Sequence, residues 1–202
     1  RSRVLRNAGD RDGALAALEN VRMLEPDHVG ALALAGEIYL TTQRFPEAAQ
    51  HLGRLAELPA APNQQRLMSG VAAVDIYENK LNDLRSALAV LVKLHAAGLS
   101  NLPVRERLAR IAAKVEAWEE ATSVLAELMH ERESKSGRID AARLAMAIRR
   151  DRLNAPESAE GAVGKLLDES PGDEEALDLV LSARFLESFW RPRLSTGLGA
   201  VV

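Results

Sequence analysis

Small and aliphatic residues recur along this chain with a nearly constant period. Each period holds one member of an alanine series, with intervals of 34, 39, 34 and 38 residues between Ala14, Ala48, Ala87, Ala121 and Ala159. The positions four and seven residues after each alanine are aliphatic in every case, starting with Leu18 and Val21. Because positions i, i+4 and i+7 lie on one face of an α-helix, the pattern predicts an amphipathic helix at the end of each period.

A second helix is predicted ahead of each of these. In residues 28–43, Leu32, Ala35, Gly36 and Tyr39 have the spacing i, i+3, i+4, i+7 of one helix face. Similar segments cover 63–80, 103–116 and 137–153, and a last one at 173–190 has no partner helix after it. Since no window shows the sustained alternation of a strand, we predict an all-α chain of about ten helices in antiparallel pairs.

This period is typical of a solenoid, in which each helix pair buries its apolar face against the neighbouring pairs. The predicted repeat domain covers residues 1–190. It comprises a half repeat at 1–28, repeats at 29–62, 63–101, 102–139 and 140–173, and an unpaired or capping helix at 173–190. The third and fifth units carry roughly one extra helical turn. Residues 191–202 are expected to form a flexible tail or the start of a further module.

The units resemble the tetratricopeptide repeat (TPR), whose signature combines Trp-x2-Leu-Gly-x2-Tyr with later alanine, phenylalanine and proline positions. In the unit from Val29, Leu32 stands at the tryptophan position, Gly36 at the glycine and Tyr39 at the tyrosine. The other units supply further matches at Gly9, Pro26, Gly70, Ala109, Ala159 and Pro171. The resemblance implies a right-handed superhelical solenoid of antiparallel helix pairs.

Close contacts between helices are expected where this signature requires small residues. Gly36, Gly70 and Ala109 should lie where two helix backbones approach each other, with the alanine series at the matching positions of the second helices. A leucine forced into such a contact would overpack it at a cost of roughly 1–3 kcal/mol.

Two prolines mark expected helix ends. Pro26 and Pro171 each stop one helix before the next begins. The aspartates that follow, Asp27 and Asp173, are expected to cap the next helix through their side-chain oxygens.

Composition narrows the classes of function. The net charge is −3, so no global basic field is available to hold nucleic acid. The absence of cysteine excludes disulfides and cysteine-ligated zinc. No uncharged run is long enough for a membrane span, and no signal segment is recognised. The start at Arg1 and the alanine, arginine and leucine bias suggest part of a larger bacterial protein. The compartment is left open between the cytoplasm and the periplasm.

The titratable residues form no catalytic constellation. The four histidines, His28, His51, His95 and His130, have no metal-ligand spacing, and no serine has a histidine placed to activate it. We therefore expect neither an enzyme nor a cofactor or metal in this chain.

In the TPR family, partners bind in a concave groove lined by the first helix of each pair, and the resemblance places a partner site there. By register the candidate groove residues are Glu37, Thr41, Gln64, Met68, Asp75, Arg107, Arg110, Lys114, Arg143, Ile148 and Arg152. Arg107, Arg110 and Lys114 form a basic stripe with spacing i, i+3, i+7. The stripe either binds an acidic peptide or is a solvated face balanced by neighbouring acids.

Two further features bear on the partner. Some family members bind chaperone C-termini through a lysine and asparagine clamp, but Ala33, Glu37 and Leu67 stand at those places, which disfavours a chaperone adaptor. At the other end, the aromatic residues Phe185, Phe189 and Trp190 lie on the last predicted helix. They either cap the last hairpin or offer an interface at the end of the solenoid.

The leading hypothesis is a non-enzymatic scaffold that binds a protein or peptide, acidic or otherwise, in the groove. One alternative is a homotypic assembly module that works through the aromatic C-terminal end. Another is a regulatory arm of an enzyme whose catalytic domain lies outside this chain. The sequence leaves the partner and the oligomeric state open.

Overall fold

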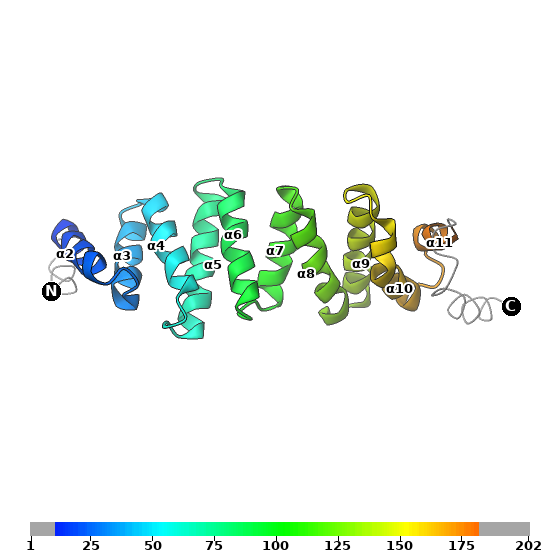
Figure 1. Cartoon of the computed structure of the whole chain (residues 1–202), viewed down its shortest axis with the longest axis horizontal. Helices are drawn as coiled ribbons and strands as arrows, with labels where there is room; N and C mark the ends of the chain where they lie inside the picture. The colour runs from blue at the N-terminus through cyan, green and yellow to red at the C-terminus, as the bar shows by residue number, and fades with distance from the viewer. Residues whose placement is uncertain (1–10, 182–202) are drawn as a thin grey trace. The chain divides into compact units, whose positions relative to one another are not determined.

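A computed structural model describes residues 11–181, which form an all-α helical-repeat fold (Figure 1). This part of the chain holds ten α-helices, one short 3-10 helix and no strand. The α-helices are α2 (Arg11–Leu24), α3 (Val29–Thr41), α4 (Phe45–Glu57), α5 (Asn63–Asn79), α6 (Leu84–Ala96), α7 (Leu102–Lys114), α8 (Trp118–Glu131), α9 (Lys135–Asp151), α10 (Glu160–Glu169) and α11 (Glu174–Leu181). The 3-10 helix η1 (Pro156–Ala159) precedes α10. The all-α repeat predicted from the period is confirmed.

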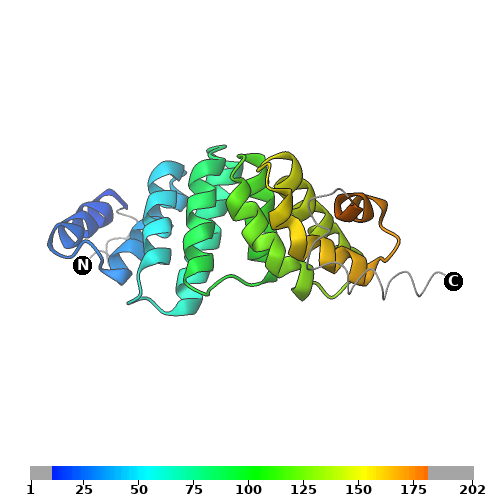
Figure 2. The ribbon, with the colours of Figure 1, turned by 45° about the vertical axis from the view of Figure 1, so that its right-hand side comes forward.

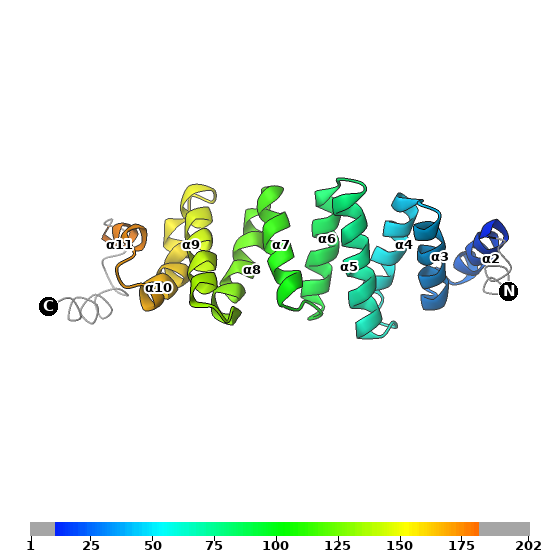
Figure 3. The same cartoon turned by 180° about the vertical axis from the view of Figure 1, so that it is seen from behind.

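The chain divides into two compact units, which are described separately below. Unit 1 spans Arg1–Val115 and includes α2 to α7, and unit 2 spans Glu116–Val202 and includes α8 to α11. We call α3, α5, α7 and α9 the first helices and α2, α4, α6, α8 and α10 the second helices. Within unit 1, α3 lies beside α4 and α5 beside α6 (Figures 1 and 3).

The alanine series occupies the core throughout the fold. All five members have a fully buried side chain, with an exposed fraction of 0%. The residue four positions later, from Leu18 to Val163, is buried in four of the five cases and half-buried at Leu52. Small buried side chains let the helices of a pair approach closely. The period of the alanine series in the sequence therefore corresponds to the spacing of these contacts.

Two glycines of the signature lie against leucine side chains of the next helix. A Cβ atom added at Gly36 of α3 would lie 2.9 Å from Leu52 of α4. One added at Gly70 of α5 would lie 2.7 Å from Leu94 of α6. No side chain fits at either position without displacing a leucine, so the close contact is with a side chain of the next helix and not with its backbone.

The turns after the first helices share one backbone conformation. A residue with positive φ occurs in each, at Gln43 (59°), Asn82 (52°), Glu116 (62°) and Asn154 (48°). Each of these residues lies five positions before a member of the alanine series. A left-handed residue at a fixed distance from a buried alanine therefore sets where each second helix begins.

The extra turn predicted for the third and fifth units lies in their first helices. α5 and α9 each have 17 residues, whereas α3 and α7 each have 13. The second helices α4 and α6 keep the same length of 13 residues. The added residues therefore lengthen one helix of the pair.

One of the two predicted aspartate caps is present. Asp173 accepts a hydrogen bond from the Ala176 backbone N–H at 3.1 Å, at the start of α11. The prediction for Asp27 is wrong, because His28 caps α3 by accepting from the Ala31 N–H at 3.1 Å. The Asp27 carboxylate is bound by Arg54 of α4 instead.

Unit 2 places α8, α9 and α10 side by side (Figure 2). Its core includes Leu128 of α8, Met146 of α9 and Leu166 of α10, all fully buried. At its edge, Arg138 of α9 donates to both carboxylate oxygens of Glu169 of α10, at 2.7 and 3.2 Å. Together with the Lys165 ammonium, this arginine lowers the pKa of Glu169 to about 2.

Candidate interaction surfaces

A charge cluster joins two first helices of unit 1. Arg107 of α7 donates to Glu78 of α5 at 2.9 Å and to Asp75 at 2.6 Å. Arg110 donates to the other oxygen of Glu78 at 2.7 Å. We call these four residues the α5–α7 cluster. Because both of its oxygens accept from guanidinium groups, with Arg110 the stronger influence, the pKa of Glu78 falls from its usual 4.5 to about 2.

The predicted basic stripe is thus largely neutralised within the chain. Two acids of α5 face two arginines of α7, and only 19% of the Arg107 side chain is exposed. Lys114, the third member of the stripe, is exposed and forms no ion pair with any residue from 11 to 181. Sequence reasoning missed Glu78, although Asp75 and Glu78 repeat the i, i+3 spacing of the arginines one unit earlier.

The remaining groove candidates of unit 1 lie at the surface. Glu37, Thr41, Gln64 and Met68 are all exposed. The Thr41 hydroxyl donates to the Ile38 carbonyl of its own helix at 2.9 Å. Met68 is 65% exposed, so a large apolar side chain protrudes from α5.

The three candidates of unit 2 have different environments. Arg143 binds the Asp173 carboxylate at 2.7 Å and so holds the cap of α11 in place. Arg152 lies over the Trp118 ring, 5.4 Å from its centroid. Ile148 is 4% exposed and belongs to the core, so it offers no surface to a partner. Its register was displaced by the longer α9, since four added residues rotate a helix by about 40° beyond one full turn.

A hollow of unit 1 lies on the face of the second helices. It has a volume of about 690 Å³ and is lined mainly by α2, α4 and α6. We call it the second-helix hollow; its uncharged lining includes Leu32, Tyr39, His51, Gly53, Tyr77 and Val90. No pattern in the sequence indicated this hollow, because its lining comes from five helices and the loop between α2 and α3.

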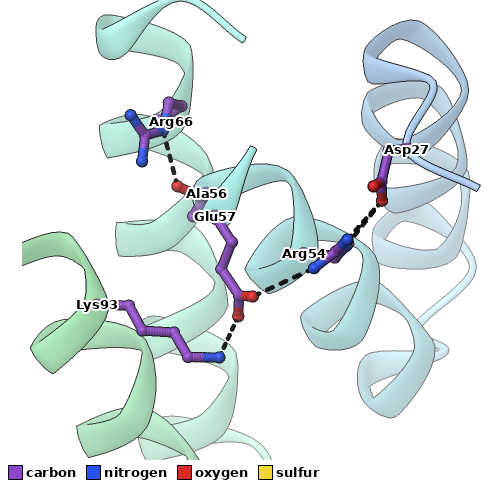
Figure 4. A network of polar contacts seen from close by, with 6 residues as sticks. All are labelled: Asp27, Arg54, Ala56, Glu57, Arg66 and Lys93. Carbon is purple, nitrogen blue, oxygen red and sulfur yellow. Dashed lines mark hydrogen bonds and ion pairs between the residues drawn. The ribbon is translucent and has the colours of Figure 1, made fainter. Parts of the chain in front are cut away.

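A ladder of ion pairs crosses one edge of this hollow (Figure 4). Asp27 accepts from Arg54 at 2.7 Å, and Arg54 reaches Glu57 at 3.5 Å. Glu57 in turn accepts from Lys93 of α6 at 2.6 Å. Beside the ladder, Arg66 of α5 donates to the Ala56 carbonyl of α4 at 3.0 Å. The Asp27–Arg54 and Glu57–Lys93 pairs join residues that are 27 and 36 positions apart in the sequence. The pattern within a single helix therefore cannot predict them.

Three other predictions concern the C-terminal residues, metal binding and membrane spans. Phe185, Phe189, Trp190 and the predicted tail at 191–202 fall outside the described residues. Within residues 11–181 no group of three or more histidine or acidic side chains is arranged to hold a metal ion. No helix in that range combines the length and the apolar character that a membrane crossing requires.

A sequence model of the tetratricopeptide repeat matches residues 5–70 of this chain. This part of the chain is similar to tetratricopeptide repeats. The resemblance recognised in the alanine, glycine and tyrosine positions is thereby confirmed. No curated protein sequence matches the chain.

Several solved structures of TPR proteins are similar to this chain. YrrB, described as a TPR protein with an unusual peptide-binding site, is 21% identical over 88% of this chain and 87% of its own, with a TM-score of 0.41. A TPR repeats protein of Bacteroides fragilis is 13% identical over 88% and 92%, with a TM-score of 0.46. A thermophilic TPR protein of Thermus thermophilus is 20% identical over 98% and 95%, with a TM-score of 0.34.

The TPR segment contributes to both surfaces of unit 1. Met68 and Gln64 on the first-helix face lie within residues 5–70, as do Asp27, Arg54 and Glu57 of the ladder. TPR segments generally serve protein–protein interaction rather than catalysis, which agrees with the scaffold predicted from the sequence.

Proposed function

We propose that this chain is a scaffold that binds a peptide or protein segment on the first-helix face of unit 1. The observation that carries the proposal is the exposure of Met68, 65% of whose surface is open to solvent. Gln64, Met68 and Asp75 have the spacing i, i+4, i+11 and so lie along one face of α5. A flexible, polarisable side chain in this position suits an adaptable apolar contact.

The charges around Met68 set the orientation of the proposed partner. Arg110 is paired with Glu78, yet 46% of its side chain is exposed, compared with 19% for Arg107. Lys114 lies one helical turn beyond Arg110 on α7. An acidic group of the partner would therefore sit at Arg110 and Lys114, while its apolar side chain covers Met68.

The test is a substitution at the apolar contact with a matched control. Met68→Glu should abolish capture of the partner by the immobilised chain, because a carboxylate would replace the apolar contact. Met23→Glu is the control, since Met23 is also exposed, at 76%, but lies on α2. Captured proteins would be identified by mass spectrometry, and folding would be checked by circular dichroism.

Two results would contradict the proposal. One is an unchanged set of captured proteins with a folded Met68→Glu variant. The other is an equal loss of capture with Met23→Glu. A Lys114→Glu variant then tests the acidic group separately, because it should weaken capture without disturbing the α5–α7 cluster.

A further inference from the structure

The geometry points to a second binding site, the second-helix hollow, which takes an uncharged, extended peptide segment of a partner protein. Its volume of about 690 Å³ falls within the range of ligand sites, roughly 300–1,000 Å³. It lies on the face formed by α2, α4 and α6, whereas the surface proposed above is formed by α5 and α7. The inference thus goes beyond the proposed function and can fail without it.

The charges around the hollow oppose a charged ligand. Every charged side chain that lines it is engaged in an ion pair, namely Glu19–Arg22, Arg44–Glu47 and the ladder Asp27–Arg54–Glu57–Lys93. Signs alternate along the ladder, so a charge placed against it would meet attraction and repulsion together. Electrostatic complementarity favours a ligand that brings no net charge of its own.

The hollow also contains neutral polar groups that form no hydrogen bond with other described residues. Tyr39 and Tyr77 line it, and neither hydroxyl forms a hydrogen bond with another residue of the described range. His51 packs against Tyr39, with 5.1 Å between the ring centroids. Both tyrosines are half-buried, so each offers a hydroxyl beside an apolar ring.

The hydrogen bond of His51 determines which ring nitrogen is available. Its Nδ1 lies 2.8 Å from the Glu47 carbonyl oxygen. A carbonyl only accepts, so Nδ1 carries the proton and donates. In the neutral ring Nε2 is then an acceptor, and it has no partner among the described residues. A peptide backbone supplies both the N–H groups for this nitrogen and the carbonyls for the tyrosine hydroxyls.

The apolar lining of the hollow accommodates small apolar side chains. It includes Leu32 and Val90, together with Gly53 and Ala89, which have little or no side chain. A Cβ atom added at Gly53 would make only an ordinary contact, 3.6 Å from Val90. An extended segment would place alternate side chains against this apolar lining while its backbone reaches the polar groups.

A random peptide library displayed on phage provides the probe. The immobilised full chain should enrich peptides that are poor in charged residues. Ala89→Trp should lower the affinity of these peptides at least about tenfold, because the indole fills the hollow from an exposed position. Ala96→Trp is the matched control, since Ala96 is exposed on the same helix α6 but does not line the hollow. It should leave the affinity unchanged.

The results that overturn the inference are distinct from those that overturn the proposed function. Enrichment of acidic or basic peptides, equal binding by Ala89→Trp, or no enrichment would each refute the hollow as this site. A concentration-dependent dimer that Ala89→Trp dissociates would also refute it, since a second copy would then be the occupant. Met68→Glu distinguishes the two surfaces, because it should affect peptides on the first-helix face and leave ligands of the hollow unaffected.

Discussion

The residue with positive φ in each turn after a first helix shows how a single position can limit stability. A non-glycine residue in the left-handed region carries a steric cost of about 1–2 kcal/mol, which asparagine tolerates better than most. Asn82 and Asn154 therefore suit their turns, whereas Gln43 holds φ at 59° with a longer side chain. The steric cost therefore differs between these turns, although their backbone conformation is the same.

Replacing Gln43 tests this cost directly. Gln43→Gly should raise the free energy of unfolding of unit 1 by about 1 kcal/mol, because glycine adopts positive φ without a clash between its side chain and backbone. Asn82→Gly should change it by only a few tenths, since asparagine already tolerates this conformation. Urea denaturation followed by circular dichroism measures both variants. Equal gains for the two would contradict the argument from the side chain.

Gly70 and Gly53 form a second pair for comparison at the residue scale. Gly70→Ala and Gly53→Ala gain the same helix propensity, so their difference isolates the packing of the added methyl group. At Gly70 that methyl would meet Leu94, which is buried, at 2.7 Å, whereas at Gly53 it would lie 3.6 Å from Val90. We expect Gly70→Ala to be less stable than Gly53→Ala by about 1–3 kcal/mol. Thermal or urea unfolding that ranks them equally would show that Leu94 moves aside without cost.

At the scale of elements, side chains as well as backbones connect neighbouring helices. The α5–α7 cluster joins two first helices through Glu78, and Arg138 with Glu169 joins α9 to α10 in unit 2. Both glutamates have a pKa lowered to about 2 by their basic partners. Ionised carboxylates therefore hold these helices together only while the pH stays above their lowered pKa values.

This linkage predicts an acid-sensitive interval. The pKa of Glu78 is about 2 in the folded chain and about 4.5 when the chain is unfolded, so the unfolded state binds the proton first as the pH falls. The contribution of Glu78 to stability should be complete above about pH 4.5 and should disappear as the pH approaches 2. Glu78→Gln should be less stable at neutral pH and depend less on pH across this interval.

The control for this experiment is Glu25→Gln, at an exposed position outside any helix. Its unfolding free energy, measured by urea titration at a series of pH values, should follow that of the unmodified chain. If Glu78→Gln also ran parallel to the unmodified chain, the cluster would not be a source of acid sensitivity.

At the scale of the whole molecule, the fold was predictable because its core contacts are periodic and local. Buried alanines, glycines at close approaches and the aliphatic i+4 positions all lie within one hairpin or between neighbouring hairpins, so they leave a period in the sequence. The longer units were visible for the same reason, as intervals of 39 and 38 residues where others have 34.

The surfaces were less predictable because they depend on how hairpins are offset from one another. Glu78 neutralises Arg110, and Asp27 binds Arg54 in place of capping α3. Neither follows from the periodicity of a single helix. Ile148 shows the same limit, since an added turn in α9 rotated it into the core. The second-helix hollow arises where three second helices meet side chains from two first helices, which is a property of their assembly.

The unequal lengths of the first helices in unit 1 have a consequence for any ligand that spans them. α5 has four residues more than α3 or α7, so it is about 6 Å longer than either neighbour. A ligand with a repetitive sequence cannot slide by one hairpin and find an equivalent place, because the adjacent helix ends earlier. Translational symmetry is thus broken within unit 1, and the register of any chain that spans these three helices would be fixed.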